Sequence, residues 1–296
     1  MNEITGLMRK KAKELLEKGV VERVIGWEKG MFFYSTTPVV IDKPEETEKL
    51  VWDDFAINNL AIYLLDKQNK EKKVALFVKG CDSRGVVRMI QDKQVKRENL
   101  YLIGVPCPGL KDPKTAVRGY YKDAGQVPKA KKCQECLHPN PVLYDEMLGS
   151  PVEEPQQIDR FAEVRELEKK STDEKYAYWK EQADKCLRCF ACRNICPACS
   201  CPECIFDCSK PRWLDKEVST VQNQFFHMIR MWHVADRCIE CGECERVCPA
   251  GLPLMQLNRK LLKDINELFG PYEAGMDLEQ RPPLTQYDTG DPEEFM

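Results

Sequence analysis

Eight of the sixteen cysteines in this chain of 296 residues fall into two copies of one spacing pattern. Each copy has three cysteines separated by two residues, and then a fourth cysteine after three more residues, followed by proline. The copies start at Cys186 and Cys238, an offset of 52 residues. This spacing is typical of bacterial proteins that bind two 4Fe-4S clusters, in which the fourth cysteine of each copy ligates the other cluster.

The pattern assigns four thiolates to each cluster. Two-residue gaps let three thiolates surround one cubane from a tight loop, and the fourth comes from the other copy. We therefore predict one cluster on Cys186, Cys189, Cys192 and Cys248, and a second on Cys238, Cys241, Cys244 and Cys196. A pair of zinc ribbons is the alternative, because C-x2-C pairs also bind zinc, although zinc requires neither the third cysteine nor the Cys-Pro step. A disulfide framework would fit a secreted chain better.

Four further cysteines follow the first copy, within the 41 residues that separate the two copies. They either hold a further metal centre or are buried structural residues, because free cysteine is among the most buried residue types. The four are Cys199, Cys201, Cys204 and Cys208. The rest of this stretch predicts a helix, and we expect its aromatic and methionine side chains, from Trp213 to Trp232, to pack in the core.

The N-terminal part of the chain predicts an α/β domain with a parallel sheet. The apolar run 74–78 predicts a buried strand, and 100–105 predicts the next strand. A helix over 86–91, capped by Asp82 or Ser83, connects them in a right-handed parallel crossover. Upstream, the sequence predicts a helix over 4–18, short strands over 20–25, 31–35 and 38–41, and a mostly apolar helix over 55–65.

Two cysteines, Cys81 and Cys107, directly follow the two strands of this crossover. Ligands bind at the carboxyl ends of strands in open parallel sheets, so we expect both thiols to face one crevice. A C-x2-C pair, Cys133 and Cys136, follows in a Lys-rich loop. Together the four thiolates predict a third 4Fe-4S cluster; the alternative is two buried structural cysteines and an isolated C-x2-C pair. The negative charge of such a cluster would be offset by Lys79, Arg84, Lys131 and Lys132.

Composition argues against several classes of function. The chain has 45 basic and 48 acidic side chains, without the basic excess of a nucleic-acid-binding protein. No apolar run reaches the roughly 18 residues of a membrane span. The first residues lead into a Leu/Glu/Lys helix and not into an apolar signal region. We therefore expect a cytoplasmic protein, and so many thiolates favour an anaerobic or well-protected cytoplasm.

These patterns divide the chain into four segments. The α/β domain covers residues 1–145, and a helical linker covers 146–180. A bacterial-type two-4Fe-4S ferredoxin domain of α+β or α-helical class covers 181–270, with an insertion, and its last helix ends at Gly270. The tail 271–296, rich in Pro, Asp and Glu, is either disordered or docks along a partner subunit.

Short strings in both parts resemble known families. The strings are Val78-Lys79-Gly80-Cys81-Asp82, Gly104-Val105-Pro106-Cys107-Pro108-Gly109 and Cys133-Gln134-Glu135-Cys136. They are similar to the beta subunits of deazaflavin-dependent hydrogenases and formate dehydrogenases. That resemblance implies a cluster on the N-terminal cysteines and commonly a bound FAD. The string Cys196-Pro197-Ala198-Cys199-Ser200-Cys201 resembles the iron–sulfur subunits of sulfhydrogenases and anaerobic sulfite reductases.

Three functions are compatible with these features. The first is an electron-transfer subunit without a substrate site, which links other redox subunits of a formate dehydrogenase, a hydrogenase or a heterodisulfide-reductase-like, electron-bifurcating complex. We predict no catalytic residue, because the three histidines, His138, His227 and His233, provide little acid–base chemistry and are expected on the surface or in packing. The second is an FAD-containing beta-type subunit that reduces a deazaflavin or a nicotinamide. The third is a scaffold whose clusters only stabilise the fold.

Overall fold

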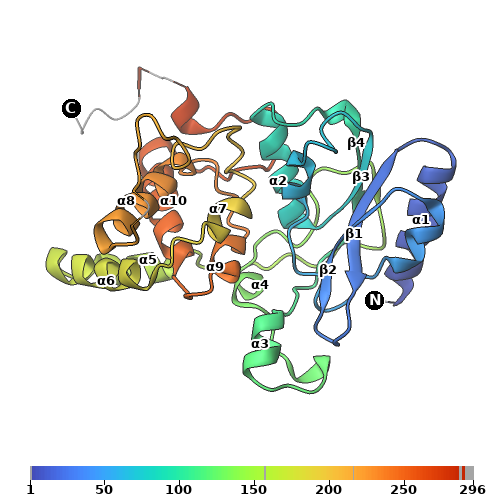
Figure 1. The fold of residues 1–296 in the computed structure, drawn as a ribbon, viewed down its shortest axis with the longest axis horizontal. Coiled ribbons are helices and arrows are strands. Elements are labelled where there is room, and N and C mark those ends of the chain that lie inside the picture. Colours follow the sequence, from blue (N-terminus) through green and yellow to red (C-terminus); the bar gives the residue numbers. More distant parts are fainter. Residues whose placement is uncertain (1, 157, 216, 287–288, 291–296) are drawn as a thin grey trace. The chain divides into compact units, whose positions relative to one another are not determined.

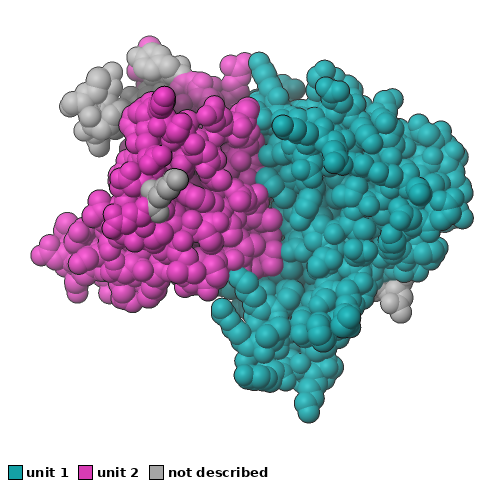
Figure 2. Space-filling model, in the orientation of Figure 1, with its two compact units in different colours: residues 1–158, 275–279 teal, residues 159–274, 280–296 magenta. Residues whose placement is uncertain are grey.

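The computed structural model describes residues 2–156, 158–215, 217–286 and 289–290. It divides into two compact units, drawn in different colours in Figure 2. Unit 1 comprises Met1–Ile158 and Gly275–Glu279, and unit 2 comprises Asp159–Ala274 and Gln280–Met296. The predicted α/β part and the repeated cysteine pattern therefore lie in different units.

Unit 1 is an α/β domain built on one mostly parallel sheet (Figure 1). The strand order is β2-β1-β3-β4-β5. Strands β1 and β2 pair antiparallel, whereas the β1–β3, β3–β4 and β4–β5 pairs are parallel. This confirms the predicted α/β class and the parallel sheet. The strands are β1 (Arg23–Lys29), β2 (Thr36–Ile41), β3 (Val74–Val78), β4 (Leu100–Gly104) and β5 (Glu146–Met147).

Helices α1 and α2 lie on opposite sides of the strands in Figure 1. Helix α1 (Asn2–Glu17) precedes β1, and α2 (Gly80–Gln91) connects β3 to β4. All five residues of β3 are buried, as expected for a central parallel strand covered on both faces. The other helical elements are short: α3 (Pro113–Arg118), α4 (Lys131–Gln134), and the 3-10 turns η1 (Pro44–Lys49), η2 (Ala61–Leu65), η3 (Arg97–Asn99) and η4 (Ala124–Gln126).

Two upstream predictions are wrong. Residues 31–35 form the loop between β1 and β2 rather than a strand, and Met31 at its tip is exposed. The predicted helix over 55–65 is reduced to η2 in its second half. Its first half is drawn out of helical geometry by long-range contacts, since the backbone N–H of Leu60 donates to the Asp82 carboxylate (2.5 Å).

Helix α2 begins earlier than the sequence predicts. Its N-cap is Lys79, so Asp82 and Ser83 lie inside the helix rather than at its cap. The Asp82 carboxylate accepts a hydrogen bond from the backbone N–H of Lys79 (2.9 Å), which closes the first turn. The earlier start places Cys81 on the helix itself, directly after the end of β3.

A bidentate ion pair joins β1 to the residue that follows β2. Nε and Nη2 of Arg23 each lie 2.6 Å from a carboxylate oxygen of Asp42. The hydrogen bond from Arg23 lowers the pKa of Asp42 below its ordinary 3.8, so the pair stabilises unit 1 above that pH. The stabilisation is lost as the pH falls through the lowered pKa.

We therefore expect Asp42→Asn to destabilise unit 1 at pH 7 but not in strong acid. The Asp42 side chain is 48% exposed, so solvent screens the pair. The loss in free energy of unfolding at pH 7 should stay below about 1 kcal/mol. Thermal unfolding of wild type and variant at a series of pH values measures the difference. A difference that persisted unchanged below the Asp42 pKa would contradict this account.

Unit 2 is helical in its described residues. Helix α8 contacts α6 and α10, and α7 packs against α9. Helix α10 ends as predicted at Gly270, whose φ of +88° suits glycine. Across the described parts of both units, no helix combines the length and the apolar character needed to cross a membrane. The helices are α5 (Ala162–Glu168), α6 (Thr172–Lys185), α7 (Ala191–Asn194), α8 (Thr220–His233), α9 (Glu243–Val247) and α10 (Leu254–Phe269), with the 3-10 turn η5 (Pro283–Thr285).

The aromatic residues of the insertion divide between core and surface. Phe226 on α8 is 1% exposed and makes edge contacts with Phe190 and Phe206. Trp213 and Trp232 are about half exposed, at 54% and 57%. The prediction that these aromatic residues pack in the core is therefore right for Phe226 and wrong for both tryptophans. Trp232 is on α8, which turns only one face inward, whereas Trp213 lies in the non-helical segment before α8.

The predicted tail 271–296 is described only in part. Within unit 1, Nε2 of Gln91 donates to the carbonyl oxygen of Asp277 (3.0 Å). Within unit 2, the backbone N–H of Leu284 donates to the carboxylate of Asp236 (2.9 Å). Residues 287–288 and 291–296 lie outside the described residues, so the alternatives of disorder and docking stay predictions for them.

Candidate metal centres

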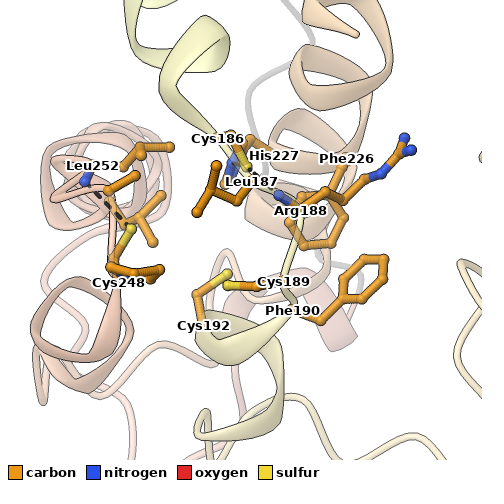
Figure 3. A pocket seen from close by; sticks show the side chains of 13 residues that line it. Cys186, Leu187, Arg188, Cys189, Phe190, Cys192, Phe226, His227, Cys248 and Leu252 are labelled. Atoms are coloured by element: carbon orange, nitrogen blue, oxygen red, sulfur yellow. Dashed lines mark hydrogen bonds between the residues drawn. The ribbon is translucent and has the colours of Figure 1, made fainter. Parts of the chain in front are cut away.

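Three cysteines of the first copy and one of the second line a cavity in unit 2 (Figure 3). Cys186 ends α6, Cys189 lies in the following loop, Cys192 is on α7, and Cys248 ends α9. Their sulfurs turn toward the same space, about 330 Å³ including its open part. The structure thus brings together the four cysteines that the sequence predicts for one cluster. Apolar side chains complete the wall, among them Phe190, Phe226, Leu252 and Leu254.

His227 on α8 lies against one of these sulfurs. Its Nε2 is 3.2 Å from Sγ of Cys186, and the side chain is buried. Burial lowers the pKa of His227 to about 4, so the imidazole is neutral at pH 7 and carries one N–H donor. The sequence predicts a surface or packing role and misses the sulfur contact, because that contact depends on how α8 packs against α6.

Two backbone amides also point at sulfurs of this group. The N–H of Arg188 donates to Sγ of Cys186 (3.3 Å), and the N–H of Leu252 donates to Sγ of Cys248 (3.4 Å). Such hydrogen bonds favour the thiolate, which is the ligating form. Burial opposes ionisation and raises the pKa of Cys192 to about 11. Metal binding at this group must therefore displace protons.

The two cysteine loops repeat one backbone conformation. Arg188 and Phe190 in the first loop have φ of +48° and +59°, and Glu240 and Gly242 at the equivalent positions of the second have +56° and +66°. A left-handed conformation costs about 1–2 kcal/mol for a residue with a side chain. Strain of this kind is retained where function requires it, and successive N–H groups in such turns form an anion-binding concavity. The repeat in sequence is therefore also a repeat in structure.

A second group of thiols forms around Cys196. Burial is the largest cause of the raised pKa values of Cys238 and Cys244. The charge of Cys196 raises both pKa values further. Nδ2 of Asn258 on α10 lies 3.8 Å from both sulfurs, those of Cys238 and Cys244. Cys241 is half-buried and packs beside Ile239. Cys196 therefore lies near cysteines of the other copy, as the exchange of fourth cysteines requires.

A buried guanidinium indicates that these groups suit an anionic cofactor. Arg230 on α8 is 3% exposed; its Nη2 donates to the carbonyl oxygen of Cys192 (3.2 Å), and its Nε has no hydrogen-bond partner among the described residues. Burial lowers the pKa of Arg230, but thiolate charges outweigh it and raise that pKa well above its usual value. A buried cation requires a negative partner. Thiolate-ligated iron–sulfur clusters are anionic, so they fit.

The four N-terminal cysteines come together in unit 1. Strands β3 and β4 are adjacent and parallel, so Cys81 and Cys107 lie at the same edge of the sheet. Burial raises the pKa of Cys107 to about 11, and the charges of Cys133 and Cys136 add to that rise. Burial also raises the pKa of Cys81, with a contribution from Cys136. The neighbouring strands that the sequence argument requires are present, and the four thiols interact.

Cations surround this group as the sequence predicts. Lys79 is 2% exposed; its Nζ lies 2.8 Å from Asp82 and 4.1 Å from the centre of the Trp27 ring. Against the larger effect of burial, its charge lowers the pKa of the nearby thiols Cys81 and Cys107. Three of the four predicted cations act on the thiols in this way: Lys79, Arg84 and Lys132.

The structure does not gather the four cysteines of the insertion into one group. A hydrogen bond between the thiols of Cys199 and Cys196 lowers the pKa of Cys196 below its ordinary value. Sγ of Cys208 lies 3.6 Å from the carbonyl oxygen of Cys204, and Cys201 is exposed. In the described part of the chain, no three His, Cys, Asp or Glu side chains are placed to hold a single metal ion. This applies to all the cysteine groups, whereas a 4Fe-4S cluster spreads its thiolates over four irons. A further centre on these four cysteines stays a prediction.

Comparison with known proteins relates the chain to iron–sulfur subunits. Residues 231–252 match the family model of the 4Fe-4S binding domain. The F420-dependent formate dehydrogenase subunit beta of Methanocaldococcus jannaschii is 23% identical over an alignment of 352 positions with gaps, which covers 92% of each chain. The F420-dependent formate dehydrogenase 1 subunit beta of Methanococcus maripaludis is 24% identical over an alignment of 355 positions, which covers 92% of this chain and 91% of the relative. A subunit of the ion-translocating oxidoreductase complex of Buchnera aphidicola is 30% identical over 83, which cover 27% of this chain and 15% of the relative.

Two sequence predictions are confirmed by these comparisons. The resemblance to beta subunits of formate dehydrogenases extends over nearly the whole chain, beyond the N-terminal strings on which it was based. The 4Fe-4S binding domain is present, and its match contains all four cysteines of the second copy. The chain is therefore similar to subunits of redox complexes along its length.

Proposed function

We propose that this chain is the iron–sulfur electron-transfer subunit of a multi-subunit anaerobic oxidoreductase. It would pass electrons through 4Fe-4S clusters without a substrate site of its own, and other redox subunits would be its partners. A formate dehydrogenase, a hydrogenase or a heterodisulfide-reductase-like, electron-bifurcating complex would contain it. The similarity to formate dehydrogenase beta subunits supports the first of these. The sixteen cysteines, many of them at the short spacings of cluster ligands, support a reducing cytoplasm.

The single observation that carries the proposal is the shared cavity of the first cysteine group. Cys248 belongs to the second copy in sequence, yet it lines the cavity of the first copy. A module with two clusters and exchanged fourth ligands requires this placement. We assign one cluster to Cys186, Cys189, Cys192 and Cys248, and the other to Cys238, Cys241, Cys244 and Cys196. When bound, each cluster supplies one-electron transfer.

Neighbouring side chains would exclude water from the first group and orient its thiolates. Phe226 meets Phe190 with ring centroids 5.2 Å apart, and Phe206 at 4.9 Å, which makes a dry wall beside the cavity. His227 would donate its N–H to the Cys186 thiolate, and Asn258 would do the same in the second group. Exposure and hydrogen bonds to sulfur are among the factors that set cluster potentials.

We further propose a third cluster in unit 1, on Cys81, Cys107, Cys133 and Cys136. Its support is the interaction of all four thiols at the carboxyl edge of β3 and β4. The buried Lys79 would offset part of the cluster charge. Electrons could then enter or leave the chain through either unit.

A second function is favoured by the names of the relatives. Both long matches are beta subunits of F420-dependent formate dehydrogenases. An FAD-containing beta-type subunit that reduces a deazaflavin or a nicotinamide is therefore the alternative. FAD would be expected in unit 1, where ligands of parallel sheets bind near the carboxyl ends of the strands.

The test is the content of iron, acid-labile sulfide and FAD in protein purified anaerobically. About eight iron per chain would support the ferredoxin module alone, about twelve would add the cluster of unit 1, and about sixteen would add a centre in the insertion. Stoichiometric FAD would favour the second function. Markedly fewer than eight iron would contradict the proposal. Clusters that bind but do not cycle in a potentiometric titration would indicate the scaffold role instead.

A further inference from the structure

We propose that Arg230 is a shared counter-charge for both clusters of unit 2, and that it raises the reduction potential of each. The inference rests on the proposed function, because it needs both clusters. Arg230 follows Phe226 and His227 by about one turn of α8, on the face that is buried in unit 2. One helix thus presents an aromatic wall, a sulfur contact and a cation to the cysteine groups.

The guanidinium reaches both groups of thiols. Its Nη2 donates to the carbonyl oxygen of Cys192, which belongs to the first group. The carbonyl oxygen that it contacts lies on α7, four residues before Cys196 of the second group, and the charges of Cys196 and Cys244 act on the guanidinium. Cys199 is the remaining main partner, so the four groups whose charges act most on Arg230 are all cysteines, and three of them are assigned as cluster ligands. This environment distinguishes Arg230 from an arginine in an ordinary carboxylate ion pair.

The charge of Arg230 should affect the reduction of the clusters as well as their binding. Arginine stays protonated at any working pH, and a side chain that is 3% exposed is little screened by salt. Reduction adds one negative charge to a cluster. A fixed positive charge nearby therefore stabilises the reduced form more than the oxidised form. Removal of that charge should lower both potentials.

His227 provides a matched comparison on the same helix face. It is neutral at pH 7 and touches a single sulfur, that of Cys186. Loss of its N–H would remove one hydrogen bond to one thiolate, and hydrogen bonds to sulfur also influence cluster potential. A His227 variant should therefore affect the first cluster only, whereas an Arg230 variant should affect both.

The experiment is an EPR-monitored redox titration of the full-length chain, purified anaerobically. Wild type is compared with Arg230→Met, Arg230→Lys and His227→Phe. At a fixed potential near each wild-type midpoint, Arg230→Met should lower the ratio of reduced to oxidised cluster about tenfold for both clusters, which is about 59 mV for one electron. Arg230→Lys keeps the charge and should change both ratios much less. His227→Phe should change this ratio for the first cluster only.

The outcomes separate this inference from the function on which it rests. A wild-type chain without clusters overturns the proposed function. If the Arg230→Met variant contains both clusters and the ratio of reduced to oxidised form is unchanged in both, or changes in only one, the inference alone is overturned. If Arg230→Met fails to assemble clusters while Arg230→Lys assembles them, the need for a buried positive charge is supported. If both fail, Arg230 acts through packing and the inference is wrong.

Discussion

The Cys248→Ser variant is expected to lose one cluster, and that cluster is the one assigned to the first copy of the pattern. Sγ of Cys248 faces the cavity of the first group, although Cys248 is the last cysteine of the second copy. A serine oxygen is a poor substitute, since iron–sulfur clusters select soft thiolate ligands. The expected loss is about four iron per chain and one EPR signal of the reduced protein.

Three comparison variants make this result decisive. Cys189→Ser should lose the same signal as Cys248→Ser, because both cysteines line the same cavity. Cys196→Ser should lose the other signal. Cys201→Ser is the matched control, because Cys201, exposed like Cys189, does not line this cavity, and its loss should leave the iron of the two ferredoxin-type clusters unchanged. If Cys248→Ser and Cys189→Ser removed different signals, the exchange of fourth ligands would be wrong.

The Gly80→Ala variant is expected to disrupt the cysteine group of unit 1. A Cβ at Gly80 would lie 1.9 Å from the carbonyl oxygen of His138 and 2.9 Å from that of Asn140. These are backbone atoms, so they cannot swing aside as the end of a flexible side chain can. The shift that relieves the clash would separate Cys81, next to Gly80, from Cys136, which lies just before the clashing segment. Overpacking costs about 1–3 kcal/mol and sometimes more, and we expect about 3 kcal/mol here.

Two measurements follow the effect of Gly80→Ala. Hydrogen exchange of the β3 and β4 amides should become faster, which reports the stability of unit 1 separately from unit 2. Iron per chain should fall by about four if unit 1 holds a cluster. Gly6→Ala in α1 is the matched control, because a Cβ there has no atom within 4 Å; it should stabilise the chain by about 0.4–1 kcal/mol. If the β3 and β4 amides of Gly80→Ala exchanged at the wild-type rate, the close approach of Gly80 to the backbone of His138 would be contradicted.

The sequence by itself was sufficient for the features that depend on local spacing. Three cysteines spaced by two residues stay close together in any fold, so the pattern at Cys238 predicted the 4Fe-4S binding domain that the family comparison confirms. The apolar run of β3 and the amphipathic pattern of α10 likewise predicted their elements, because burial selects side chains at the period of the local backbone. The short strings around Cys81 and Cys107 were enough to indicate similarity to formate dehydrogenase beta subunits.

Only the tertiary structure decided which distant residues meet. The pairing of β3 with β4 brings Cys81 to Cys107, and the hydrogen bond from Leu60 to Asp82 replaces part of a predicted helix. The packing of α8 places His227 and Arg230 beside thiols that lie far away in the sequence. No spacing rule predicts these contacts, because they depend on how whole elements pack and on the burial of charge within a complete unit.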